Sequence, residues 1–249
     1  MASQTFLRTA VAVALLGTWV AAQASTVTFT GYTYGTGAQG NGNTVNVTSP
    51  TYNGAAGGYK GNLVGFGSWD GAFESFCVDL GEFFSFGVAY NSYTLLTASA
   101  HFGTTKADAL GKLISYVYGN NIFATAGDKD AQSTAVQLAV WNIVYDTDIT
   151  LNSGGGATFS DSSIYRNDSG TAFMGANSLL MNSQLASQAI RYELAVLRSV
   201  DAAGPPVVEG RQDQLVWRQN AVPEPASLAL AALALGAAGI ASRRRKTLG

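Results

Sequence analysis

The single cysteine of the chain, Cys77, is the first candidate for chemistry. It lies in the segment Ser-Phe-Cys-Val-Asp-Leu at residues 75–80, and the chain has no second cysteine for an internal disulfide. An accessible thiol in an oxidising compartment is prone to oxidation or cross-linking. The sulfur is therefore buried and inert, paired with another chain, or already bonded to another group of this chain. On a strand, Asp79 would share the face of Cys77.

Gln137 is the second candidate, because its surroundings predict that its amide is buried. It is the one polar residue of Ala-Val-Gln-Leu-Ala-Val-Trp at residues 135–141. Seven residues make two helical turns, so apolar side chains surround Gln137 on every face. A buried primary amide needs partners for two donors and a carbonyl, and each unmet group costs about 1–3 kcal/mol. Backbone groups would satisfy the amide, or a reaction would consume it.

A thioester between these two side chains would remove both the free thiol and the buried amide. The Cys77 sulfur would attack the side-chain carbonyl of Gln137, and ammonia would leave. The product is an activated acyl group that an amine or a hydroxyl can attack with loss of the thiol. Apolar walls would keep water away from it. A protein of this kind acylates once and is not a turnover enzyme.

The two motifs resemble those of the thioester domains on surface adhesins of Gram-positive bacteria. That family has an aromatic-Cys-hydrophobic-Asp motif and, well downstream, a Gln-x-Ala-Ile/Val-Trp motif. The resemblance spans residues 60–150 of this chain. It implies that Cys77 and Gln137 form the crosslink, with Asp79 as the motif acid and Trp141 packed one turn beyond Gln137. Val136 stands where the family often has threonine.

Other chemistries have less support in the sequence. A cysteine hydrolase needs a base, and the only histidine, His101, precedes a predicted helix where capping or packing explains it. Aspartates flank the helix predicted at 131–145, but neither group has the glycine and bidentate glutamate of a Ca²⁺ loop. Capping by Asp128 or Asp130 is the better explanation. We therefore expect no metal and no other cofactor.

The elements that must position these residues change in character along the chain. Segments 26–30 and 44–48 alternate like strands, the aromatic segment 73–86 predicts two strands, and 90–98 predicts another. Helical periodicity follows at 105–118, 131–145 and 177–200, and a last strand is predicted at 214–218. This order predicts an α+β fold: an antiparallel β-sandwich or barrel-like sheet with an inserted helical subdomain.

The first 24 residues have the three parts of a secretory signal peptide. Arg8 precedes an apolar run at 10–22, which ends in Ala-Gln-Ala at 22–24. A core of roughly 13 residues is shorter than the about 20 that span a bilayer. We expect signal peptidase to cut after Ala24.

The C-terminal residues 223–249 have a second sorting pattern. A Pro-Glu-Pro motif precedes an apolar run at 226–241 and a basic cluster; the motif residues are Pro223, Glu224, Pro225, Arg243, Arg244 and Arg245. The run would make a short transmembrane helix of roughly 24 Å, and its basic end would stay cytoplasmic. The tail resembles the PEP-CTERM sorting signal. The resemblance implies transient anchoring in the inner membrane of a Gram-negative bacterium and cleavage near Pro-Glu-Pro by an exosortase.

The body between the two signals, residues 25–222, is long enough for one domain with a sizeable core. It contains nine of the 14 basic residues and 15 of the 16 acidic ones, which gives a formal charge of −6, or −7 if Glu224 remains attached to it. This mildly acidic body without a basic stripe argues against nucleic acid as a partner.

Two functions stay open for this exported body, at the cell surface or in the extracellular matrix. In one it bonds covalently, through the thioester, to a nucleophile on an extracellular polysaccharide or a surface protein. In the other it is a non-covalent structural component of the exopolysaccharide or biofilm matrix, with Cys77 buried and inert.

Overall fold

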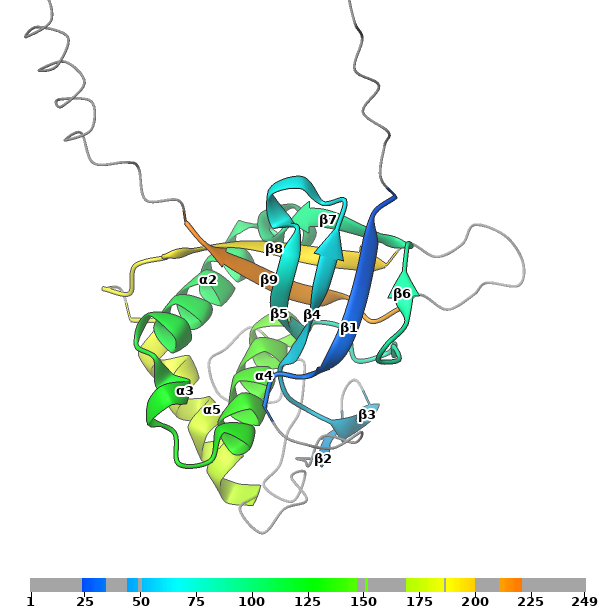
Figure 1. Ribbon diagram of the computed structural model, residues 1–249. Helices are drawn as coiled ribbons and strands as arrows, with labels where there is room; N and C mark the ends of the chain where they lie inside the picture. Colours follow the sequence, from blue (N-terminus) through cyan, green and yellow to red (C-terminus); the bar gives the residue numbers. More distant parts are fainter. Residues whose placement is uncertain are drawn as a thin grey trace, which may run out of the picture.

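The structure is a computed structural model that describes residues 24–34, 44–48, 51–146, 151, 169–185, 187–199 and 211–220 (Figure 1). The predicted signal peptide up to residue 23 and the whole predicted sorting tail, with its transmembrane helix, lie outside these residues. Within the described ranges, none of the helices combines the length and the apolar character needed to cross a bilayer.

Seven strands form an antiparallel sheet in the order β6-β1-β4-β5-β9-β8-β7. Their bounds are β1 Thr26–Tyr32, β4 Tyr59–Val64, β5 Gly71–Cys77, β6 Ala89–Tyr90, β7 Tyr93–Thr97, β8 Tyr192–Ser199 and β9 Gln214–Gln219. The edge strands β6 and β7 are neighbours in the sequence. The Phe29 ring of β1 lies 5.6 Å from that of Phe73 on β5 and 6.0 Å from that of Tyr93 on β7. The sheet therefore curls into a nearly closed barrel around an aromatic core.

A two-stranded hairpin stands apart from the barrel (Figure 1). It consists of β2, Thr44–Thr48, and β3, Thr51–Ala55. Tyr52 of β3 is 6% exposed, and its ring lies 5.2 Å from that of Trp141. The hairpin thus covers part of the helical layer through one aromatic side chain.

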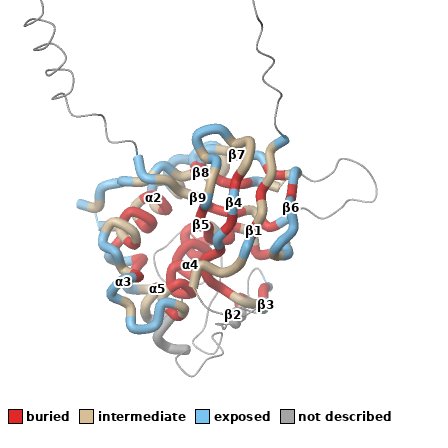
Figure 2. The backbone as a smooth tube through the Cα atoms, in the orientation of Figure 1, coloured by how far each residue is buried: buried red, intermediate tan, exposed pale blue. Residues whose placement is uncertain are grey.

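The helices are inserted between β7 and β8 and lie together beside the barrel (Figure 1). Their bounds are α1 Ala98–Phe102, α2 Thr104–Gly119, α3 Ile122–Thr125, α4 Lys129–Tyr145 and α5 Ser169–Ser183, and a 3₁₀ turn, η1, covers Gly67–Trp69. Twelve of the 17 residues of α4 are buried, as its apolar sequence predicts, and Figure 2 shows its buried backbone at the centre of the molecule. The Asp128 side chain caps α4 by accepting bonds from the N–H groups of Asp130 and Ala131. The predicted α+β class and barrel-like sheet are confirmed.

The helix predicted at 177–200 is wrong over its second half. Helix α5 ends at Ser183, and residues 192–199 form strand β8. This strand lies between β7 and β9, and its Ala195, Val196 and Leu197 are all buried. A strand covered on both faces has a continuous apolar run, which short-range periodicity does not distinguish from a buried helix.

The second strand predicted within 73–86 is also absent. Strand β5 ends at Cys77, and the aromatic residues that follow belong to a loop in which Phe84 and Phe86 pack against the core. The Phe84 ring stacks on Phe29 at 3.9 Å, and the Ser85 N–H donates to the Tyr90 hydroxyl. The aromatic density of this segment serves to close the end of the barrel.

Candidate functional site

Cys77 and Gln137 meet at the boundary between the barrel and helix α4. Both side chains are fully buried. The Cys77 N–H donates to Gln137 Oε1 at 2.9 Å, and Gln137 Nε2 donates to the Cys77 carbonyl at 2.8 Å. The side-chain amide of Gln137 therefore bonds both backbone groups of Cys77, as a neighbouring strand would.

The strand register explains why a residue of helix α4 takes the place of a neighbouring strand at Cys77. Strand β9 pairs with β5 as far as Cys77, but β4 pairs with β5 only from Gly71 to Ser75. The Val78 N–H points to the β9 side, where it bonds the carbonyl of Asp213, the residue before β9. Because successive backbone groups of a strand point to opposite sides, those of Cys77 face the side that β4 has left. Gln137 fills that gap.

This contact has two chemical consequences. It satisfies the amide carbonyl and one amide hydrogen, which stabilises an unreacted glutamine. It also places the carbonyl group against the residue that carries the thiol, and the Cys77 N–H would stabilise negative charge on Oε1 during attack at the carbonyl carbon. The same geometry suits an inert buried amide and a thioester precursor.

The Cys77 sulfur is buried against backbone rather than against a base. Its Sγ donates to the Asp79 carbonyl at 2.6 Å. Burial raises the pKa of the thiol, while the Asp79 backbone and the Trp141 indole lower it to a smaller extent. The thiol is therefore protonated at neutral pH, unlike the thiolate of a cysteine hydrolase. Reaction with Gln137 would be a slow, single event in which ammonia carries the thiol proton away.

Asp79 lies beyond the end of β5, so the expectation that it shares a strand face with Cys77 is wrong. Its Oδ1 accepts from the Gly81 N–H at 2.7 Å, which stabilises the turn after the strand. The backbone carbonyl of Asp79, not its carboxylate, contacts the sulfur. The side chain thus stabilises the turn that follows the site.

A chain of buried polar side chains beside the sulfur was not predicted. Ser75 donates to Gln214 Oε1, Gln214 Nε2 donates to Gln212 Oε1, and Gln212 Nε2 donates to the Asp79 carbonyl. The sequence gives only weak notice of this polar chain. Gln212 and Gln214 are two residues apart, just before and at the start of β9, and polar residues of a half-exposed strand have the same spacing. These bonds fix the acceptor that faces the Cys77 thiol.

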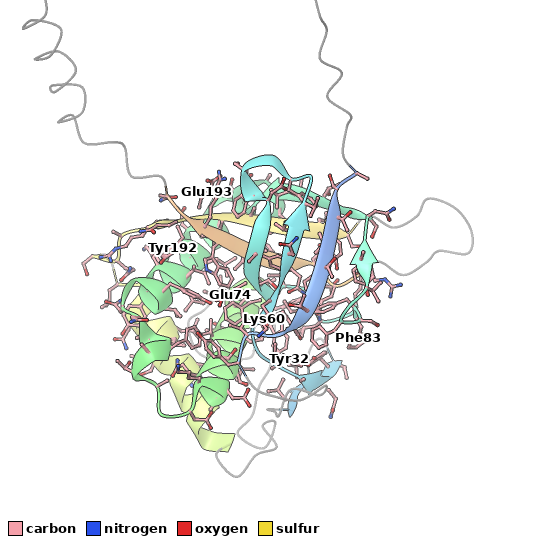
Figure 3. The ribbon with its side chains drawn as sticks, viewed as in Figure 1. Tyr32, Lys60, Glu74, Phe83, Tyr192 and Glu193 are labelled. Atoms are coloured by element: carbon pink, nitrogen blue, oxygen red, sulfur yellow. The ribbon has the colours of Figure 1, made fainter. Side chains whose placement is uncertain are left out.

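An aromatic pocket of about 360 Å³ lies next to the site. Ten uncharged residues line it: Tyr32, Tyr52, Gly54, Ala55, Tyr59, Phe83, Phe84, Ser85, Phe86 and Gln212. Figure 3 places Tyr32 and Phe83 at the end of the barrel nearest the hairpin, and Phe83 is 62% exposed. The pocket reaches the site through Tyr52, which contacts Trp141, and Gln212, which bonds Asp79. Cys77 and Gln137 are not among the residues that line the pocket.

His101 lies on α1 with its Nε2 at 3.9 Å from Asp213 Oδ2. Burial, and then Arg198, lower the pKa of His101, and Asp79 partly opposes them. No contact between His101 and the Cys77 sulfur is found in the described part of the chain. Among these same residues, no group of three or more His, Cys, Asp or Glu side chains is arranged to hold a metal ion.

Comparison with known families matches only the tail of the chain. Residues 221–246 match the PEP-CTERM protein-sorting motif, and this range contains Pro223, Glu224, Pro225 and the basic cluster of Arg243, Arg244 and Arg245. Comparisons with curated proteins and with solved structures found no match. The motif supports the assignment of this chain as an exosortase substrate that is exported to the cell surface or the extracellular space.

Proposed function

We propose that the body of this exported protein attaches covalently to a surface or matrix target through a thioester between Cys77 and Gln137. The observation that supports this proposal is the fully buried contact in which the Gln137 amide bonds both backbone groups of Cys77. The protein acts once per molecule, as an acylating module and not as an enzyme.

The reaction has two steps. In the first, the Cys77 sulfur bonds to the side-chain carbonyl carbon of Gln137, the C–N bond breaks, and ammonia leaves with the thiol proton. In the second, an amine or hydroxyl of the target bonds to that carbon and the C–S bond breaks. The proton of the nucleophile passes to the sulfur, and the target is left joined to residue 137 by an amide or an ester. The Cys77 N–H stabilises negative charge on the carbonyl oxygen in both steps.

The test uses methylamine as a small nucleophile. The mature protein is incubated with methylamine, digested and analysed by peptide mass spectrometry, and a thiol alkylating agent marks the released sulfur. The proposal predicts a methylamide at residue 137 and an alkylated Cys77. The Cys77→Ala variant is the control and incorporates none. Wild-type protein that stays unmodified at residue 137 under conditions that expose the site would contradict the proposal.

Tyr52 shields the site from the pocket, so Tyr52→Ala is expected to speed the reaction with methylamine. Removal of the ring exposes Trp141 and opens a path from the pocket, and loss of water exclusion raises the rate of nucleophilic entry by on the order of tenfold. The rate is followed by the appearance of free thiol. Tyr192→Ala, a similar change on β8 outside this pocket, is the matched control. Equal acceleration in both variants would exclude entry past Tyr52.

The second candidate function is a non-covalent component of the extracellular matrix. It is favoured by the same bonds, because they satisfy Gln137 Oε1 and one hydrogen of Nε2 without any reaction. In that case Cys77 is a small buried apolar residue. The two functions differ in the covalent state of residue 137 in the mature protein.

A further inference from the structure

Trp141 has a buried donor that the packing of the protein does not use. The residue is 1% exposed, and its Nε1 has no hydrogen-bond acceptor among the residues that the structure describes. A buried donor without a partner is costly, and tryptophan is a poor choice where only an apolar ring is needed. Phenylalanine would fill an apolar site without this cost. The N–H is therefore available to an acceptor that becomes strong only when the site reacts.

The position of the indole indicates which acceptor this is. Trp141 follows Gln137 by four residues on α4, so the two side chains lie on the same face of the helix. Its effect on Cys77, to lower the pKa of the thiol, is that of an N–H directed at the sulfur. The indole N–H makes no hydrogen bond to a described residue while the sulfur is a thiol that donates to the Asp79 carbonyl. The Tyr52 ring packs edge-on against the indole, with ring centroids 5.2 Å apart and an interplanar angle of 64°.

We propose that the Trp141 indole N–H is the donor that holds the negative charge on the Cys77 sulfur when the thioester opens. This inference rests on the thioester proposed above. As the target nucleophile attacks residue 137, the electron pair of the C–S bond passes to the sulfur. The apolar surroundings make a bare thiolate costly there, and the indole N–H stabilises it until the proton of the nucleophile arrives. The same bond would stabilise the sulfur as it attacks Gln137 during thioester formation.

The test compares wild type with Trp141→Phe, which keeps an aromatic ring and removes the N–H. The mature, thioester-bearing protein is mixed with methylamine, and the released thiol is measured over time. A hydrogen bond to a charged group lost from the reacting sulfur predicts a rate about 10- to 100-fold lower. Trp217→Phe, at a half-buried tryptophan of β9, is the matched control and should keep the wild-type rate.

A second readout separates this role from simple packing. In protein already opened by methylamine, the pH dependence of alkylation reports the pKa of the Cys77 thiol. Loss of the indole donor should move this pKa upwards in Trp141→Phe, whereas a looser fit without loss of a donor would admit water and move it downwards. An unchanged opening rate together with an unchanged thiol pKa overturns the inference.

A shape-preserving replacement covers the case in which Trp141→Phe misfolds or fails to form the thioester. Benzothienylalanine at position 141 replaces the indole N–H by sulfur and keeps the bicyclic shape. The inference predicts slow opening, or no thioester, in this variant, and a wild-type thioester with a wild-type opening rate overturns it. If wild type itself keeps an intact Gln137 amide, the thioester and this inference both fail. If the thioester is present and only the position 141 results are negative, this inference alone fails.

Discussion

Methylamine is expected to lower the free energy of unfolding of the mature protein by about 4 kcal/mol, because it cuts a covalent link across 60 residues. The thioester joins the end of β5 to the middle of α4. It therefore restricts the unfolded chain in the same way as a disulfide that closes a loop of that length. The measurement is urea denaturation of the protein before and after complete reaction with methylamine.

Cys77→Ala is the control for this effect. It has no thioester, so its stability should be the same with and without methylamine, and it should lie near that of opened wild type. A wild-type protein whose free energy of unfolding does not respond to methylamine, although residue 137 has become a methylamide, would show that the crosslink contributes nothing to stability.

Gln137→Ala is expected to destabilise the protein even where no thioester can form. In a Cys77→Ala background the Gln137 amide still bonds the N–H and the carbonyl of residue 77. Its removal leaves two buried backbone groups without partners, at about 1–3 kcal/mol each, so the expected loss is about 2–6 kcal/mol. Thermal and urea denaturation of the single and double variants measure it.

The matched control is Gln132→Ala in the same background. Gln132 is a half-exposed glutamine of the same helix. Its replacement should change the free energy of unfolding by less than about 0.5 kcal/mol. A similar loss in the free energy of unfolding on replacement of Gln132 and of Gln137 would mean that the bonds between Gln137 and the end of β5 do not hold the helix to the barrel.

The sequence predicts the elements around the site better than the way they meet. The run at residues 135–141 indicates a helix buried on all sides, and the charge pattern before it places a cap at Asp128 or Asp130; the structure has a buried α4 capped by Asp128. The single buried amide and the single thiol then identify Gln137 and Cys77 as the candidate site residues. These inferences depend on local composition and on helical periodicity, which a sequence displays directly.

The features that could not be predicted from the sequence depend on contacts between distant segments. The apolar run of β8 also fits a helix, and the segment is a strand because it pairs between β7 and β9. The shorter pairing of β4, which leaves the backbone of Cys77 to Gln137, is a matter of register. Tyr52 and Gln212 approach the site from β3 and from the chain before β9. No local pattern marks side chains that a tertiary fold brings together.

The most direct test of the central claim is the intact mass of the mature wild-type protein, compared with that of identically processed Cys77→Ala. The thioester predicts that wild type lacks the mass of one ammonia after correction for the substitution, and that its folded form resists thiol alkylation. High-resolution peptide analysis separates a hydrolysed thioester, which leaves glutamate at residue 137, from a glutamine that never reacted. A wild-type protein of full mass, with glutamine at residue 137 and Cys77 freely alkylated on unfolding, would contradict the account.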